Sequence, residues 1–190
     1  MPPSKRDELV EAAMRVFERQ GFHTSGLDAV LREAGISRMT VYNHFRSKND
    51  LIVAALRRKD ECSRHALMTH VDQAPDPASR VRALFDFHER WFTCREFKGC
   101  MFLGAAAEFD DPDGAIRRTV AEHAREVARY VEGLCADLGV DDPKEAACDL
   151  MLLLQGAIVA AHAIGQCEGD PGAPARRARR LACRLLDIDG

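Results

Sequence analysis

The sequence predicts an all-α protein of about nine helices. Apolar residues recur at helical spacing along most of the chain, and no segment alternates between apolar and polar residues as a half-buried strand does. The chain also carries repeated helix start signals, in which a capping residue or an Asp-Pro pair precedes an apolar-periodic stretch. These observations favour a bundle of helices over any fold that contains a sheet.

Three short helices and one long helix are expected over the first third of the chain. Ser4 and Asp7 have the spacing of a capping box and start the first helix, and Ser47 and Asp50 repeat that spacing at the start of the long one. Ser37 is the N-cap residue of the third helix. The expected bounds are 4–20, 27–34, 38–44 and 48 to about 70.

Five further helices are expected in the rest of the chain. Asp76-Pro77, Asp111-Pro112 and Asp142-Pro143 each have an N-cap residue followed by proline at the first helical position, and each is expected to start a helix. Gly99 and the loop 169–174 separate the remaining elements. The expected helices run from 77 towards Gly99, over 100–109, over 112–138, from 143 through the apolar run 150–165, and over 175–186.

Composition indicates a globular protein, with 46% hydrophobic and 30% charged residues. The N-terminus lacks the apolar stretch of a signal peptide, and the run 150–165 is shorter than the roughly 20 residues that a membrane span needs. Seven cysteines are irregularly spaced without a Cys-x-x-Cys pair, which argues against a disulfide framework and a zinc site. We therefore expect a cytoplasmic protein with no membrane partner, metal or cofactor.

Charge is distributed unevenly although the net charge is only −3. Residues 1–60 carry eleven Lys/Arg against eight Asp/Glu, and no acidic residue lies between Glu33 and Asp50. A local basic patch on an acidic protein is typical of a surface that binds phosphate groups, although such patches are also found on ordinary solvated surfaces.

Three short helices with a tight glycine-containing turn between the second and third are typical of a helix-turn-helix. Val41 and Phe45 are expected in its small core, so the other side chains of the third helix face outward and fit a DNA major groove about 12 Å wide. The alternative is that Tyr42 and His44 are ordinary packing residues. The outward set is Arg38, Met39, Thr40, Tyr42, Asn43 and His44.

Residues 9–56 resemble the TetR family of bacterial regulators. The resemblance is most specific in Thr40-Val41-Tyr42-Asn43-His44-Phe45-Arg46-Ser47-Lys48, with support from Gly21-Phe22, 27–30 and 34–37. It implies an Ω-shaped homodimer whose last two helices form a four-helix bundle, a palindromic DNA operator, and a small-molecule effector whose binding releases the DNA. The implied domains are 1–48 for DNA binding and 49–190 for effector binding and dimerisation.

The resemblance also implies roles for particular residues. Thr40, Tyr42, His44 and Lys48 match positions that contact DNA, and Ser25 matches one that often touches phosphate, whereas Gly26 departs from the usual polar residue. Arg38 and Asn43 are suited to reading base edges. The complete set of expected DNA-binding residues is Ser25, Ser37, Arg38, Met39, Thr40, Tyr42, Asn43, His44 and Lys48.

The aromatic residues between 80 and 165 are candidates for an effector pocket, which would take an apolar or aromatic molecule. The alternative is that they only fill the core. Four polar side chains in this region are candidates to orient a ligand. The expected pocket residues are Phe85, His88, Trp91, Phe92, Phe102, Glu108, His123 and His162.

The segment 150–165 is too apolar for a surface helix and, with Leu181, Leu185 and Leu186, is the candidate dimer interface; a central helix of a monomer is the alternative. Cys94 and Cys100 lie close to Lys98, and a nearby cation lowers a thiol pKa, so a redox-triggered repressor is a second hypothesis. An interaction module without DNA binding is a third. A helical-bundle enzyme is disfavoured because the chain has no Glu-x-x-His pair, nucleophile elbow or phosphate loop.

Overall fold

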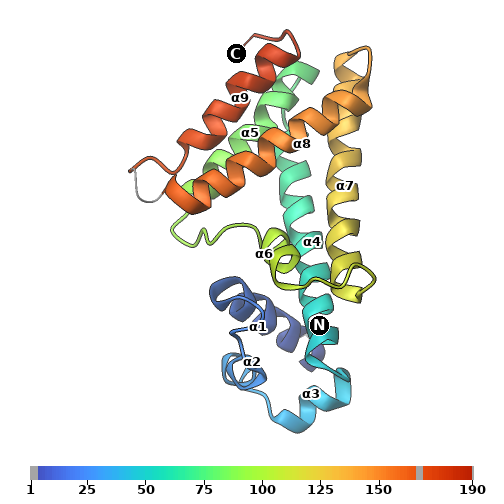
Figure 1. Cartoon of the computed structure of the whole chain (residues 1–190), viewed down its shortest axis with the longest axis vertical. Helices are drawn as coiled ribbons and strands as arrows, with labels where there is room; N and C mark the ends of the chain where they lie inside the picture. Colours follow the sequence, from blue (N-terminus) through green and yellow to red (C-terminus); the bar gives the residue numbers. More distant parts are fainter. Residues whose placement is uncertain (1–3, 166–168, 190) are drawn as a thin grey trace. The chain divides into compact units, whose positions relative to one another are not determined.

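The computed structural model describes residues 4–165 and 169–189. Within these ranges it contains nine α-helices, a π-helical turn that extends the eighth, and no strand, which confirms the predicted fold class (Figure 1). The helices are α1 (Lys5–Gln20), α2 (Leu27–Ala34), α3 (Arg38–His44), α4 (Lys48–Val71), α5 (Pro77–Thr93), α6 (Met101–Glu108), α7 (Ala115–Leu138), α8 (Pro143–Ala160) and α9 (Ala173–Leu185), and the π-helical turn is Ala161–Gly165.

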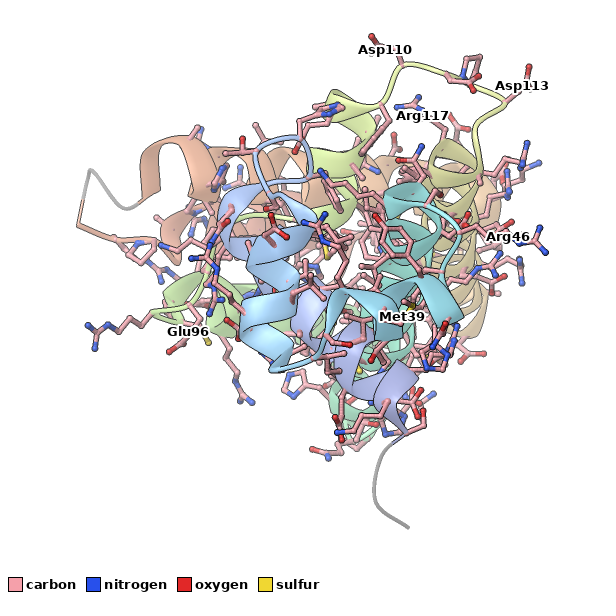
Figure 2. All side chains as sticks on the ribbon, turned by 90° about the horizontal axis from the view of Figure 1, so that it is seen from below. Met39, Arg46, Glu96, Asp110, Asp113 and Arg117 are labelled. Carbon is pink, nitrogen blue, oxygen red and sulfur yellow. The ribbon has the colours of Figure 1, made fainter. Side chains whose placement is uncertain are left out.

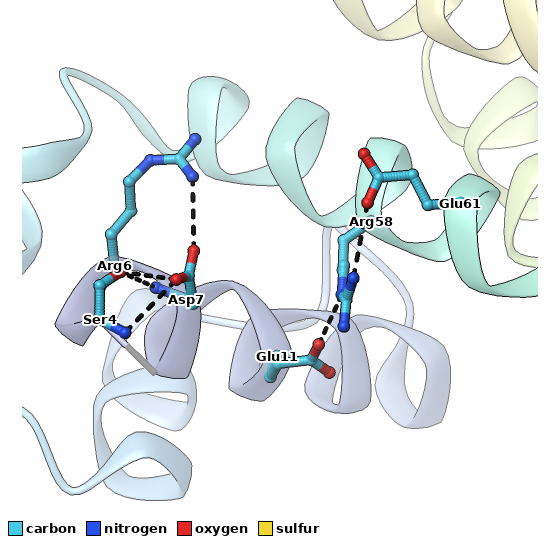
Figure 3. Close-up of polar contacts among 6 residues, drawn as sticks. All are labelled: Ser4, Arg6, Asp7, Glu11, Arg58 and Glu61. Atoms are coloured by element: carbon cyan, nitrogen blue, oxygen red, sulfur yellow. Dashed lines mark hydrogen bonds and ion pairs between the residues drawn. The ribbon is translucent and has the colours of Figure 1, made fainter. Parts of the chain in front are cut away.

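Most helix starts are determined by the capping residues expected from the sequence. The Ser4 hydroxyl accepts from the backbone N–H of Asp7 at 3.2 Å, and the Asp7 carboxylate accepts from the backbone N–H of Ser4 at 3.4 Å, as Figure 3 shows. The carboxylates of Asp76 and Asp142 accept from the backbone N–H groups of Ser79 and Glu145 and cap α5 and α8. Each cap supplies an acceptor to an N–H group that has no partner within the helix.

One expected helix start is wrong. Asp111-Pro112 forms a turn instead, and α7 begins three residues later at Ala115. The Asp111 carboxylate accepts from the backbone N–H of Asp113 at 3.1 Å, and its carbonyl accepts from the N–H of Gly114 at 3.1 Å. The side chain that could cap a helix therefore caps a turn. Figure 2 labels Asp113 on this turn and Asp110 just before it.

The chain forms two compact units that are discontinuous in sequence. The first unit comprises residues up to Ser63 together with Cys100–His123, and the second comprises Arg64–Gly99 together with the chain from Ala124 onward. The unit that contains α1 to α3 therefore also includes the start of α4, all of α6 and the start of α7. Helices α4 and α7 contribute residues to both units.

The first unit has a core of apolar side chains from all of its helices. Val16 and Phe17 of α1, Val30 of α2 and Leu51 of α4 are buried together with Phe102 of α6. An ion pair on the surface joins α1 to α4: Arg58 of α4 contacts Glu11 of α1 at 2.7 Å, and it also contacts Glu61 of its own helix at 3.5 Å (Figure 3). Because the core draws on residues about 90 positions apart, the three N-terminal helices are held on a larger base than their own sequence provides.

The second unit is built around α5, α8 and α9, which lie side by side (Figure 1). Leu84, Phe85 and Phe92 of α5 and Leu150 and Leu154 of α8 are buried, as are Ala175, Ala178 and Ala182 of α9. The small residues on α9 allow it to pack close to its neighbours. Arg176 and Arg179 of α9 pair with Glu89 at 2.5 Å and Asp86 at 2.6 Å on α5.

The most apolar helix has the length of a membrane span. Pro143–Ala163 is a helical stretch of 21 residues with mean hydropathy 1.6, so by length and composition it could cross a membrane, and the expectation that it is too short is wrong. The expectation considered only the apolar run 150–165, whereas the helix begins at Pro143, as expected, and includes the residues before that run. A helix that packs against other helices in a water-soluble protein has the same composition, so these values alone identify no membrane partner.

Candidate nucleic-acid interface

Helix α3 lies on the surface of the first unit because only one side of it is apolar. Val41 is 2% exposed, and Phe45, which follows the last turn, is also buried in the core. The Ser37 hydroxyl accepts from the backbone N–H of Thr40 at 3.3 Å and caps the helix. Since Val41 and Phe45 are four residues apart, they fix the rotation of α3 about its axis and direct its other side chains outward.

The outward side of α3 carries large side chains in solvent. Met39 is 72% exposed and Tyr42 is 57% exposed, and Asn43 and His44 are exposed as well. Figure 2, seen from the α3 side, labels Met39 on this helix and shows Arg46 extending from the loop that follows it. A short helix with a buried aliphatic side and an exposed side of aromatic, amide and imidazole groups fits a groove that offers base edges and phosphates.

Arg38 at the start of α3 forms an ion pair with Asp28 in the first turn of α2. Both side chains are exposed, so the pair orients the guanidinium and leaves it accessible from solvent. Asp28 is absent from the set expected from the sequence. The only signal for it was an acid in the first turn of a helix, which the helix dipole explains equally well.

Ser37 and Thr40 have a local role in addition to any contact with DNA. Their hydroxyl oxygens lie 3.0 Å apart, and Ser37 also caps α3. Ser37 is exposed, whereas Thr40 is half-buried.

Ser25 is fully buried, contrary to its expected position at the surface. Its hydroxyl donates to the carbonyl of Gly21 at 2.5 Å. This bond closes the turn between α1 and α2, so the hydroxyl is not available to a phosphate in this structure. The hydroxyl of Ser25 instead satisfies a free backbone carbonyl at the end of α1.

Lys48 is half-buried, and its ammonium group donates to the carbonyl of Phe22 at 2.5 Å. Burial lowers the pKa of Lys48, and the nearby carboxylate of Glu108 partly offsets this effect. The side chain therefore connects the start of α4 to the loop after α1.

Glu108 at the end of α6 was expected in an effector pocket, and the structure places it elsewhere. Its carboxylate accepts from the backbone N–H of Phe22 at 3.0 and 3.1 Å and from that of His23 at 2.6 Å. The Nε2 of His23 donates to the carbonyl of Glu108 at 2.7 Å. We call these contacts the Glu108 clamp. It fixes the loop before α2 to α6.

Gly21 is required at the edge of this clamp. Its φ of +79° is unfavourable for any residue with a side chain, and an added Cβ would lie 3.1 Å from the Glu108 carboxylate. Both the backbone conformation at position 21 and the close approach of Glu108 therefore favour glycine there.

The expected pocket residues of the second unit gather around α5. The ring of His88 lies 6.1 Å from those of both Trp91 and Phe92, and Phe97 links Trp91 at 5.0 Å to His162 at 6.3 Å. Phe85, Phe92 and His88 are buried, Trp91 is half-buried and His162 is exposed. Trp91 and His162 are therefore the members of this group that solvent reaches.

The two remaining pocket candidates lie in the first unit. Phe102 is buried, and its ring stacks on that of His123 with centroids 3.6 Å apart. The Nδ1 of His123 lies 2.7 Å from the Asp60 carboxylate. The structure thus divides the eight candidates, with Phe102, Glu108 and His123 in the first unit and the other five in the second.

The environment of Cys100 opposes the reactivity that the sequence suggested. Its side chain is half-buried, and desolvation raises its thiol pKa, the reverse of the lowering expected from Lys98. Cys94 is exposed, and its thiol donates to the Arg90 carbonyl at 3.2 Å. Cys167 lies outside the described residues. Among those described, no group of His, Cys, Asp and Glu is arranged to hold a metal ion.

Comparison with protein families covers both parts of the chain. The model described as bacterial regulatory proteins, tetR family, matches residues 9–55. The model described as tetracyclin repressor-like, C-terminal domain, matches residues 77–181, which is more than half of the chain.

Individual relatives agree with these matches. The HTH-type transcriptional activator FasR of Mycolicibacterium smegmatis is 37% identical over 89 residues, which are 45% of this chain and only 41% of that relative. The HTH-type transcriptional regulator LmrA of Bacillus subtilis is 26% identical over 158 residues, or 81% of this chain and 84% of LmrA. The crystal structure of a TetR-family transcriptional regulator from Streptomyces coelicolor superimposes with a TM-score of 0.87 at 30% identity, covering 98% of this chain and 90% of that one. The chain therefore belongs to the TetR family of bacterial regulatory proteins and is a DNA-binding transcriptional regulator of the helix-turn-helix type.

Proposed function

We propose that the protein is a cytoplasmic repressor that binds a palindromic operator as a homodimer and leaves it when a small molecule binds. The observation that carries the DNA-binding part is the outward side of α3, where Met39 and Tyr42 are more than half exposed while Val41 is buried. A rigid helix that presents such side chains is suited to the major groove.

The chemistry of each side chain suggests its role. Arg38, oriented by Asp28, and Asn43 read base edges, because a guanidinium pairs with guanine and an amide with adenine. Met39 makes apolar contact with a thymine methyl group. Tyr42 and His44 donate to phosphates from exposed positions. Ser37, Thr40 and Lys48 complete the phosphate-facing edge.

DNA binding is tested with fragments of the source genome selected by the purified protein, followed by gel-shift titration. The double substitution Tyr42→Ala and His44→Ala should abolish specific binding, because both side chains are exposed and contribute little to the fold. Arg125→Ala is the matched control, since it removes an exposed cation from the middle of α7. Unchanged affinity of a folded double variant would refute the assignment of α3, and an equal loss with Arg125→Ala would indicate unspecific attraction.

The dimer interface is expected on α8 and α9. Leu152 is 69% and Val159 55% exposed on α8, and Leu181 and Leu185 are exposed on α9. Leu152 and Val159 are two helical turns apart, and exposed Gly156 lies between them, so one side of α8 is apolar and closely approachable. Large exposed apolar side chains in such an arrangement are typical of a protein interface.

Leu152→Glu with Val159→Glu should convert a dimer into a monomer in analytical ultracentrifugation, because each places a charge in the apolar interface. Arg125→Glu, on the exposed part of α7, should leave the dimer intact. A wild-type protein that sediments as a monomer would contradict this part of the proposal and leave the DNA-binding test unaffected.

The effector proposed here is an apolar or aromatic molecule that reaches Trp91 and His162 in the second unit. Trp91 is the single tryptophan of the sequence, so its fluorescence reports on this region alone. Candidate ligands that release the operator should change Trp91 emission at the same concentrations. A ligand that releases DNA without any change in this emission would place the effector elsewhere. A reporter gene behind the operator distinguishes repression from activation.

A further inference from the structure

A groove in the second unit is lined by residues other than those discussed as effector ligands. It has a volume of about 480 Å³ and is formed by the end of α4, by α5 and by Arg179 of α9. Sites for small molecules typically have volumes of roughly 300–1,000 Å³, so the groove is large enough for a small metabolite. None of the eight expected pocket residues lines it.

The groove carries an excess of positive charge. Arg82 donates to two neutral acceptors, the carbonyl of Asp189 at 2.7 Å and the hydroxyl of Ser79 at 3.0 Å, and the guanidinium of Arg90 lies 3.5 Å from the Nδ1 of His70. In the described part of the chain neither guanidinium forms an ion pair with a carboxylate. Their charges are therefore not neutralised by a direct partner.

The acids near the groove are engaged with other groups. Asp86, which lines it, pairs with Arg179 at 2.6 Å, so these two charges compensate each other. Asp76, before α5, accepts from the backbone and hydroxyl of Ser79, and its carboxylate also attracts Arg82 electrostatically without a direct contact. The net charge of the lining side chains Arg82, Asp86, Arg90 and Arg179 is thus positive.

His70 adds a hydrogen-bond donor for which the described part of the chain offers no acceptor. Its Nδ1 lies 3.5 Å from the Nη1 of Arg90, and because a guanidinium only donates, Nδ1 is the acceptor and the ring proton lies on Nε2. Nε2 is buried and has no hydrogen-bond partner among the residues that the structure describes. A buried donor without an acceptor is unfavourable, and such groups in native proteins often mark the place of a ligand or water.

We propose that this groove binds a small molecule through a carboxylate or phosphate group, which Arg82 and Arg90 pair with beside the side chain of His70. Two guanidinium groups without carboxylate partners provide charge-assisted hydrogen bonds to such an oxyanion. No residue of α3 and none of the expected effector residues lines this site, so it goes beyond the operator and effector proposed above.

The proposal is tested by nuclear magnetic resonance on the full-length protein without DNA. Inorganic phosphate and succinate are titrated separately at constant pH and ionic strength, with chloride as the balancing anion. The resonances followed are the His70 side-chain Nε2–H and the Arg82 and Arg90 Nε–H groups. Both anions should shift these resonances in a saturable manner with millimolar dissociation constants. The anion with the lower dissociation constant identifies the preferred oxyanion.

Arg90→Gln should weaken binding by about tenfold, because it removes a charge-assisted contact. Arg177→Gln is the matched control: it removes an exposed arginine of α9 that does not line the groove, and it should leave the affinity unchanged. The absence of saturable shifts in the wild-type protein would overturn the proposal without any variant. An equal loss in both variants would overturn it too, since binding would then follow the general charge of the surface.

Discussion

The Glu108 clamp predicts that one carboxylate in α6 controls the order of the loop before α2. Replacing Glu108 with alanine removes the acceptor for the backbone N–H groups of Phe22 and His23, which lie more than 80 residues away in the sequence. The loop would still be held by Ser25 and Lys48. We therefore expect a locally loosened loop in a protein that otherwise remains folded.

The magnitude follows from the two amides that lose their acceptor. A hydrogen bond to a charged group contributes about 1.5–3 kcal/mol. The His23 amide is exposed and water replaces its acceptor, whereas the Phe22 side chain is buried and its amide is less accessible. The free energy of local opening at Phe22 should therefore fall by roughly 2–3 kcal/mol, which corresponds to amide exchange about 30–150 times faster. Glu108→Gln keeps a neutral acceptor, so its effect should be near fivefold.

Amide hydrogen exchange of the full-length protein, resolved at Phe22 and His23, measures this effect directly. Glu122→Ala is the control, because Glu122 is an exposed acid of α7 in the same unit. Exchange at Phe22 that stays within twofold of the wild-type rate in a folded Glu108→Ala variant would refute the reasoning. So would equal acceleration in the control.

Three further predictions concern Asp28, His88 and the thiols. Asp28→Asn releases Arg38, so specific binding should persist with about 1–3 kcal/mol less discrimination at the base pair that Arg38 reads, measured with singly substituted operators; an unchanged pattern would argue against an orienting role. Burial lowers the pKa of His88 in the folded protein, so below the ordinary value of about 6.5 the unfolded chain binds a proton that the folded chain does not. The free energy of unfolding should accordingly decrease as the pH falls below about 6.5, by at most about 1.4 kcal/mol per pH unit, and urea titrations of His88→Phe should show a weaker dependence if His88 is the cause. Because burial raises the pKa of Cys100, iodoacetamide should alkylate the exposed Cys62, Cys94 and Cys148 first, as peptide mass spectrometry would show; preferential labelling of Cys100 would restore it as a redox candidate.

The sequence by itself determined the features that depend on neighbouring residues. The caps at Ser4, Ser37, Asp76 and Asp142 are local hydrogen bonds between a side chain and a backbone group three residues away, so spacing alone predicts them. The same holds for the outward side of α3, because helical period fixes which of its residues share a side with Val41. Asp111-Pro112 is the exception, since the same local chemistry also stabilises a turn.

Only the tertiary structure decided the roles of Ser25, Glu108 and Cys100. Each depends on burial or on a partner supplied by another element, such as Phe22 for Glu108. A carboxylate on a helix looks the same in sequence whether it faces a ligand or a backbone amide 86 residues away. The groove around His70 and Arg90 is also visible only in the tertiary structure, because it forms where α4, α5 and α9 meet. Local hydrogen bonding and periodicity act within a few residues, whereas burial and charge pairing depend on the packing of the whole unit.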